Sequence, residues 1–239
     1  MKARILHPWR VDITAARKIQ ERLSRRVSPS WPGRPVRRIA GADVSFPCRA
    51  RALAAVVVLS YPDLVLLETA IAEGPCPMPY VPGFLSFREV PVLLDAFESL
   101  ACEPDLILFD GQGMAHPRRL GLASHAGLLL NKPSIGCAKS RLFGDHDPVP
   151  RSKGSSRPLR APDGEVVGAV LRTRTGVRPV YISVGHKIDL DTALQFVLAV
   201  SPRYRIPEPV RMADRLTREA RRPVRVADRL TKERTRRTR

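Results

Sequence analysis

The sequence predicts an α/β protein with a central mixed β-sheet flanked by helices, and three observations support this prediction. Three β-like runs follow one another at residues 38–46, 51–61 and 64–73, with short breaks that contain Pro or Arg, as in an antiparallel meander. Helix-like and strand-like segments then alternate, which indicates α/β units. The run DLILFDG at residues 105–111 is apolar throughout its centre, which is typical of a strand buried on both faces.

Four helices are expected from apolar residues that recur at helical spacing. The first begins at Asp12, a residue type that caps helix N-termini. The second carries Pro91 near its start, where a missing N–H is best tolerated. The expected ranges are residues 12–26, 86–100, 122–131 and 189–201.

Two further predictions complete the sheet. Residues 134–139 are expected to form a short buried strand, and residues 165–173 and 177–185 are expected to pair as a hairpin. Residues 145–164 are polar and rich in Pro, Ser and Arg, so they are predicted to form a loop.

The C-terminal region contains an imperfect repeat. Residues 209–222 and 223–236 both contain Ala-Asp-Arg-Leu-Thr, and from residue 203 onward 14 Lys or Arg stand against 5 Asp or Glu. We expect a single domain over residues 1–222 and a basic, flexible extension over residues 223–239. This extension either contacts nucleic acid or is a solvated tail left by a duplication.

The net charge of +18 over 239 residues indicates a polyanionic partner, because neutralising phosphates releases counterions. Only seven of the 41 basic residues are lysine, so part of the charge also fits the Arg-rich drift of a GC-rich genome. The four cysteines form no C-x-x-C pair, which disfavours a zinc site and favours a reducing, cytoplasmic compartment. No run of 18 apolar residues is present, so no membrane span is expected.

Three acidic residues lie in or beside apolar segments, where burial makes a carboxylate energetically unfavourable. Asp43 interrupts the first strand, Asp110 ends the most apolar strand, and Glu89 lies in a helix that follows a proline-rich loop. Carboxylates converging from strands and a helix suit a hard cation such as Mg²⁺. Taken singly, each has a simpler interpretation, as a strand-end cap for Asp110 or a surface residue for Glu89.

Two basic side chains accompany these acids. His116 follows a glycine-rich turn and could contact or protonate a phosphate, and Lys139 ends a buried-looking strand. A lysine there could hold a scissile phosphate, or simply reach solvent.

Taken together, five segments resemble the endonuclease V family of deoxyinosine-directed repair nucleases. They are AGADVSF, PYVPGFLSFRE, LILFDGQGMAHPRRLGLASHAGL, IGCAKSRLFG and GAVLRTRTGVRPVYISVGHKIDL, and the resemblance covers roughly residues 10–218. It implies an RNase H-like fold. It also implies that Asp43, Asp110 and Glu89 hold metal, that Asp214 lies close to the metal, and that His116 and Lys139 lie near the scissile phosphate. Asp228, in the second repeat copy, is interpreted as a bystander.

The stretch PYVPG resembles the family's wedge, which inserts into the duplex at the lesion. A base must leave the stack before its edge can be read, and an aromatic ring on a proline-stiffened loop can fill the gap at low entropic cost. Tyr80 would stack against bases, Gly83 would let the backbone approach the flipped base, and Leu85 would wall the pocket. The expected substrate-binding residues are Pro79, Tyr80, Val81, Pro82, Gly83 and Leu85.

The resemblance implies a metal-dependent endodeoxyribonuclease that uses Mg²⁺, with Mn²⁺ as a substitute. It would nick the second phosphodiester bond 3′ to deoxyinosine and leave a 3′-hydroxyl and a 5′-phosphate. The expected partner is double- or single-stranded DNA containing deoxyinosine, and the expected state is a monomer away from membranes. Three alternatives remain: an endoribonuclease for inosine-containing RNA, another RNase H-like nuclease without an inosine pocket, and a non-catalytic nucleic-acid binder.

Overall fold

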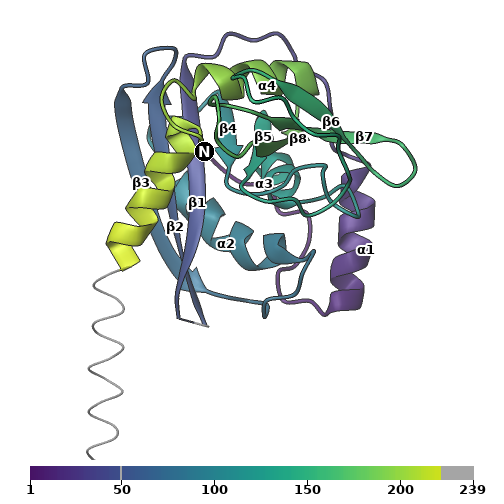
Figure 1. Cartoon of the computed structure of the whole chain (residues 1–239). Helices are drawn as coiled ribbons and strands as arrows, with labels where there is room; N and C mark the ends of the chain where they lie inside the picture. Colours follow the sequence, from purple (N-terminus) through teal and green to yellow (C-terminus); the bar gives the residue numbers. More distant parts are fainter. Residues whose placement is uncertain (49, 222–239) are drawn as a thin grey trace, which may run out of the picture.

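An eight-stranded mixed β-sheet forms the centre of the protein in the computed structural model, which describes residues 1–48 and 50–221 (Figure 1). The strand order is β3-β2-β1-β4-β5-β8-β7-β6. The strands are β1 (Arg38–Cys48), β2 (Arg51–Ser60), β3 (Leu66–Pro75), β4 (Leu106–Phe109), β5 (Ser134–Ala138), β6 (Ser156–Arg160), β7 (Val166–Leu171) and β8 (Val180–His186).

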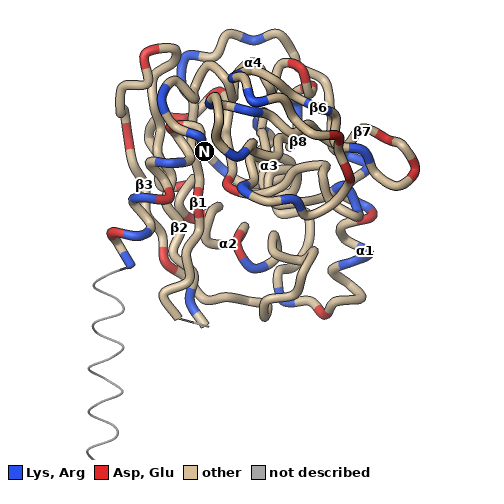
Figure 2. The backbone as a smooth tube through the Cα atoms, in the orientation of Figure 1, with Lys and Arg blue, Asp and Glu red and all other residues tan. Residues whose placement is uncertain are grey.

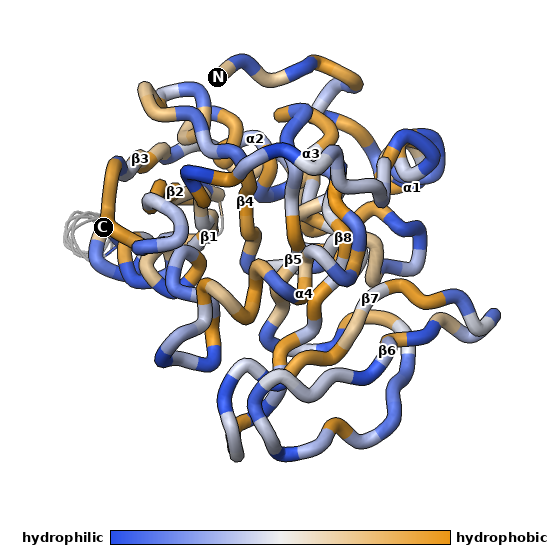
Figure 3. The backbone as a smooth tube through the Cα atoms, turned by 90° about the horizontal axis from the view of Figure 1, so that it is seen from above, coloured by the Kyte–Doolittle hydropathy of each residue, from blue (hydrophilic) through white to orange (hydrophobic). Residues whose placement is uncertain are grey.

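The three central strands β1, β4 and β5 run parallel, whereas every other pair in the sheet is antiparallel. Strands β4 and β5 are buried along their whole length, and Figure 3 shows β4 as a hydrophobic segment between more polar loops. The carboxyl end of β4 lies beside the middle of β1, because Ala42 of β1 pairs with Phe109. Asp43 and Asp110 each follow one residue later, so the sheet itself brings them together.

Helices cover both faces of the sheet. Helices α2 (Leu85–Glu98) and α3 (Leu122–Leu130) pack on one face, and α4 (Leu190–Ala199) and a C-terminal helix of residues 208–221 pack on the other. Helix α1 (Ile13–Ser24) is capped by Asp12, whose side chain accepts from Ala15 N, and it packs beside the loop that precedes α2.

The predicted meander, the α/β units, the hairpin of β7 with β8 and the four helices are confirmed. The loop predicted at residues 145–164 is wrong in part, because it contains β6, which pairs with β7. Only Leu159 of this edge strand is buried, so its sequence lacks apolar alternation. The expected position of Pro91 is also wrong, because α2 begins at Leu85 and Pro91 is therefore its seventh residue.

Basic residues are spread over much of the part of the chain that the structure describes. Lys and Arg lie along α1, on the loops near α4 and β6, and on the C-terminal helix (Figure 2). Over the part of the chain that the structure describes, no helix is long and apolar enough to cross a membrane. All four cysteines are free.

Candidate active site

Three carboxylates from distant parts of the sequence meet where β4 ends beside the middle of β1. Asp43 lies in β1, Asp110 follows β4, and Asp214 lies in the C-terminal helix. One oxygen from each lies within 4.8 Å of the others, the only such acidic group among the described residues. Three converging carboxylate oxygens match the oxygen-rich ligand set that a hard divalent cation prefers.

A glycine in β1 allows the C-terminal helix to reach this point of the sheet. A Cβ atom at Gly41 would lie 2.1 Å from the carbonyl carbon of Pro209 and 2.4 Å from the amide nitrogen of Val210. The backbones therefore touch where any larger residue would separate them. Because side chains alternate along a strand, Asp43 shares a face with Gly41 and points toward the same helix.

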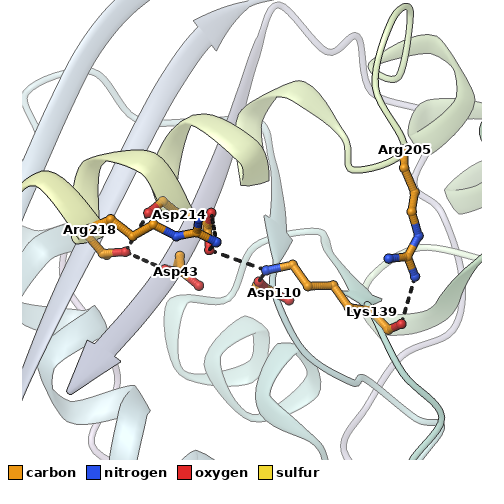
Figure 4. A network of polar contacts seen from close by, with 7 residues as sticks. Asp43, Asp110, Lys139, Arg205, Asp214 and Arg218 are labelled. Atoms are coloured by element: carbon orange, nitrogen blue, oxygen red, sulfur yellow. Dashed lines mark hydrogen bonds and ion pairs between the residues drawn. The ribbon is translucent and has the colours of Figure 1, made fainter.

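Lys139 supplies positive charge beside the acids (Figure 4). Its Nζ forms an ion pair with Asp110 and lies 3.4 Å from Asp214 Oδ1. Burial lowers the Lys139 pKa, but the hydrogen bond to Asp110 and the surrounding carboxylates outweigh burial and raise it. Arg205 fixes the Lys139 backbone, since its Nη2 donates to the carbonyl of Lys139 at 2.8 Å.

The pKa of Asp43 is raised to about 6. Burial is the largest cause, and the charges of Asp110 and Asp214 add to it. Thr217 opposes the shift, because its hydroxyl donates to Asp43 Oδ2 at 2.7 Å. Ionising all three acids together is therefore unfavourable without additional positive charge, and a bound cation would supply it.

Glu89 lies outside the group of three and is buried in α2. Its pKa is raised well above the usual value, mainly by burial and further by the charges of Asp43 and Asp110. Arg88, whose guanidinium stacks over the Phe46 ring at 4.2 Å, partly offsets this effect. Burial therefore favours the protonated form of Glu89, and a cation bound nearby would favour the ionised form.

A cavity of about 360 Å³ opens beside Asp110 and Lys139. Its size falls within the range of small-molecule pockets. Its lining comes from the loop of residues 79–83, called the wedge loop after its predicted role, and from the start of α2, the turn after β4, the start of α3 and the end of β5. It includes Tyr80, Gly83, Leu85, Gln112, His116 and Gly121. The cavity thus joins the predicted recognition residues to the acids.

The wedge loop is anchored on both sides of an exposed tip. Met78 and Phe84 are buried against Phe87, whereas the Tyr80 side chain between them is 67% exposed. Gly83 has a φ of +79°, a conformation that favours glycine. The loop therefore presents an aromatic ring to solvent on a fixed base.

The Gly83 carbonyl is the main anchor of this loop. It accepts hydrogen bonds from Gln20 Nε2 at 2.9 Å, Arg118 Nη2 at 2.8 Å and His116 Nε2 at 3.0 Å. His116 Nδ1 in turn accepts from the Arg118 amide at 3.1 Å. Burial lowers the His116 pKa to about 4, so this ring is a neutral structural link in the free protein. Its predicted contact with a phosphate stays a prediction.

The structure brings Asp43, Asp110, Asp214 and Lys139 into one cluster, and it places Tyr80, Gly83, Leu85 and His116 around the adjoining cavity. Asp228 lies outside the described residues. Sequence reasoning missed Thr217, Gln20, Arg118, Gln112 and Ser86. Of these, Thr217 had a usable signal, since it lies three residues after Asp214 and so shares its helix face.

Carboxylates clustered where a central parallel strand ends, beside an open cavity and an exposed aromatic loop, are typical of a metal-dependent nuclease. Comparisons with known proteins identify the family to which the chain belongs. The family profile of Endonuclease V matches residues 17–215. Endonuclease V of Roseiflexus castenholzii is 53% identical over 221 residues, which are 92% of this chain and 99% of that protein. The chain belongs to the Endonuclease V family.

Solved structures agree with this assignment. The crystal structure of Endonuclease V from Streptomyces avermitilis matches with a TM-score of 0.85 at 44% identity, over 92% of this chain and 97% of that one. Ciona intestinalis Endonuclease V, solved with a 24mer DNA containing an inosine followed by a ribo-adenosine, matches with a TM-score of 0.81 at 29% identity, over 89% and 98%. The RNase H-like fold expected from the sequence is confirmed.

Proposed function

We propose that this protein recognises deoxyinosine in DNA and nicks the second phosphodiester bond 3′ to it, leaving a 3′-hydroxyl and a 5′-phosphate. One observation carries the proposal. A single cavity is lined both by Tyr80 and Gly83 of the wedge loop and by Asp110 and Lys139. Reading of a flipped base and cutting of its strand can therefore occur in one complex.

The wedge loop performs the first step. Tyr80 is exposed at the tip, and stacking it into the duplex would fill the gap that a departing base leaves. Three hydrogen bonds already hold the Gly83 carbonyl, so little conformational entropy is lost on binding. A deaminated base is mispaired and therefore costs less to extrude than a paired one.

The acids fit a magnesium ion, with manganese as a substitute. Asp43, Asp110 and Asp214 would hold it, and Glu89 would join them or order its water shell. When bound, such an ion activates a water nucleophile and stabilises charge at the phosphate. Asp110 and Asp214, which would hold the ion, also pair with Lys139, so ion binding would leave the Lys139 ammonium free to contact the substrate.

Lys139 then acts on the scissile phosphate. In the metal-free protein the neighbouring acids outweigh burial and raise its pKa, which favours the ammonium form. Arg205 holds the backbone carbonyl of Lys139. The ammonium group can then neutralise charge that develops on the non-bridging oxygens of the phosphate.

A strand-nicking assay tests this function. A duplex with one deoxyinosine, the matched undamaged duplex and an inosine-containing RNA are each incubated with the protein and Mg²⁺, and the products are mapped. We expect one nick at the second bond 3′ to deoxyinosine, and none in the undamaged duplex. Cleavage of the RNA alone would transfer the function to RNA, and uniform cutting of all substrates would contradict lesion recognition.

A further inference from the structure

A second cavity, of about 950 Å³, opens at the other end of the central strands from the acids. It is lined by Asp105, which immediately precedes β4, whereas Asp110 immediately follows that strand. At about 3.3 Å per residue, the two positions are about 16 Å apart along the strand. The second cavity, called the far cavity below, shares no lining residue with the cavity at the wedge loop.

The lining of the far cavity is strongly basic. It contains five Lys or Arg and one acid, Asp105. The Asp105 carboxylate is already engaged, because its Oδ2 accepts from the backbone amides of Arg37 and Arg38 at 2.9 Å each. Within the described residues, no acid forms an ion pair with Arg34, Arg37 or Lys187. The fold therefore gathers cations here without matching them with acids from the described part of the chain.

Like charges are held close together around Lys187. Its pKa is lowered, first by burial and then by the charges of Arg4, Arg34 and Lys132. Its backbone has a φ of +50° and that of Asn131 a φ of +54°, which is uncommon for residues other than glycine. The Lys187 ammonium donates to the Asn131 carbonyl at 3.4 Å. A bound anion would relieve the repulsion between these cations.

Hydrogen bonds fix the wall that carries Arg34 and Arg37, which is the segment between α1 and β1. The Lys187 amide donates to the Ser28 carbonyl at 2.6 Å, and the Ser28 amide donates to His186 Nδ1 at 3.2 Å. The two hydrogen bonds to Asp105 hold the other end of the segment. Walls that are already ordered lose little conformational entropy when a ligand binds.

The far cavity also has an aromatic side chain in its lining. Trp31 is half-buried and packs against Phe196 of α4, with ring centroids 5.7 Å apart. Single-stranded nucleic acid is bound by this combination of groups, because cations contact the phosphates while bases stack on aromatic rings. The chemistry of the lining therefore favours a nucleic-acid strand over an anion without bases.

We propose that the far cavity is a second nucleic-acid site, which holds a single strand with its phosphates on Arg34, Arg37 and Lys187 and a base stacked on Trp31. The inference goes beyond the proposed function, because it concerns binding and requires no cutting. The far cavity and the acids lie at opposite ends of β4, so both sites can be filled at once. The protein then holds a second strand while a duplex occupies the acids.

Binding of a labelled oligothymidylate of about 12 nucleotides, measured by fluorescence anisotropy in EDTA over a range of salt concentrations, tests the cations. The triple variant Arg34→Gln, Arg37→Gln, Lys187→Gln should bind at least about 10-fold more weakly than the wild type. The logarithmic salt slope should fall by about 2, since each phosphate contact on a single strand contributes about 0.7.

The matched control is the triple variant Arg151→Gln, Arg157→Gln, Arg174→Gln. It removes the same charge from exposed residues that do not line the far cavity, so its affinity should change by less than about threefold. Residues 223–239 are the same in all the proteins compared. Equal losses in the two triple variants would overturn the proposal, because general charge would then explain the binding.

Fluorescence of Trp31 tests stacking in a protein that keeps every cation. The chain has two tryptophans, Trp9 and Trp31, so Trp9→Phe leaves Trp31 as the reporter. We expect the oligothymidylate to quench this fluorescence and thymidine triphosphate, at the same nucleotide concentration, to leave it unchanged. Equal quenching by both would identify a site for a small nucleotide, and no quenching by either would exclude stacking. Both results would overturn the proposal.

Simultaneous occupancy is tested with one equivalent of an unlabelled deoxyinosine duplex, with Ca²⁺ in place of Mg²⁺. The oligothymidylate should still bind and quench Trp31 in the presence of the duplex. Its complete displacement would mean that the two ligands share one site, which would contradict a second nucleic-acid site.

Discussion

At the scale of single residues, Asp43 shows that ionising the acids of the site is unfavourable in the metal-free protein. Its pKa is about 6 in the folded protein against an ordinary value of 3.8. The folded state therefore holds its proton more tightly than the unfolded state does. The stability that this proton contributes is complete below pH 3.8 and is lost as the pH rises through 6.

This shift predicts the pH dependence of stability in metal-free protein. Asp43→Asn removes the ionisation, so the variant should be more stable than the wild type at pH 7, by on the order of 1–3 kcal/mol. The difference should shrink as the pH falls from about 6 to about 4. Urea unfolding in EDTA across this range measures it. A constant difference at every pH would mean that Asp43 has an ordinary pKa.

Thr217 is predicted to position Asp43. Thr217→Val keeps the shape of the side chain and removes the hydroxyl that donates to Asp43 Oδ2. Loss of this hydrogen bond should cost about 1–2 kcal/mol of the free energy that holds Asp43 in position. The Mg²⁺ concentration for half-maximal nicking should rise several-fold, and Thr217→Ser should restore it. Equal Mg²⁺ dependence in the wild type and Thr217→Val would show that the hydroxyl is not needed.

Several of these residues were predictable and others were not, for a physical reason. Asp43 and Asp110 are visible in the sequence because each interrupts or ends an apolar strand. Gln20 is not, because its role depends on a hydrogen bond to the carbonyl of Gly83, 63 residues away. A pattern along one segment cannot reveal a contact with a segment so distant in the sequence.

At the scale of secondary-structure elements, docking of the C-terminal helix on β1 completes the acid cluster. This helix supplies both Asp214 and Thr217, and the close backbone approach at Gly41 holds it there. The four helices and the central strands were predictable because their apolar periodicity is strong. Strand β6 was not, because an exposed edge strand needs little apolar alternation.

Gly41→Ala should therefore separate the C-terminal helix from the sheet. The added Cβ would lie within 2.4 Å of the backbone of Pro209 and Val210, so we expect a loss of more than about 2 kcal/mol and nearly complete loss of nicking. Gly74→Ala in β3 is the matched control, because its Cβ would meet nothing closer than 3.8 Å. Thermal unfolding and nicking are measured for both. Similar behaviour of the two variants would contradict the role of Gly41.

At the scale of the whole molecule, charge governs encounter with nucleic acid. Residues 223–239 contain seven Lys or Arg and two Asp or Glu, a net charge of +5 that lies outside the described residues. Removing them should weaken binding to undamaged DNA and flatten its dependence on salt, by up to about 0.9 in logarithmic slope for each phosphate that the shortened protein no longer neutralises. Nicking at saturating protein should be unchanged. An unaltered salt slope would identify the segment as a passive tail.

The central claim is that Asp43, Asp110 and Asp214 form the metal site of a lesion-directed nuclease. The most direct test is a single-turnover time course on a duplex carrying one deoxyinosine, with Mg²⁺ or with EDTA, for the wild type and Asp110→Asn. We predict a single nick only for the wild type with Mg²⁺, and a loss of at least about 1,000-fold in the variant. Nicking in EDTA, or wild-type nicking by Asp110→Asn, would contradict the claim.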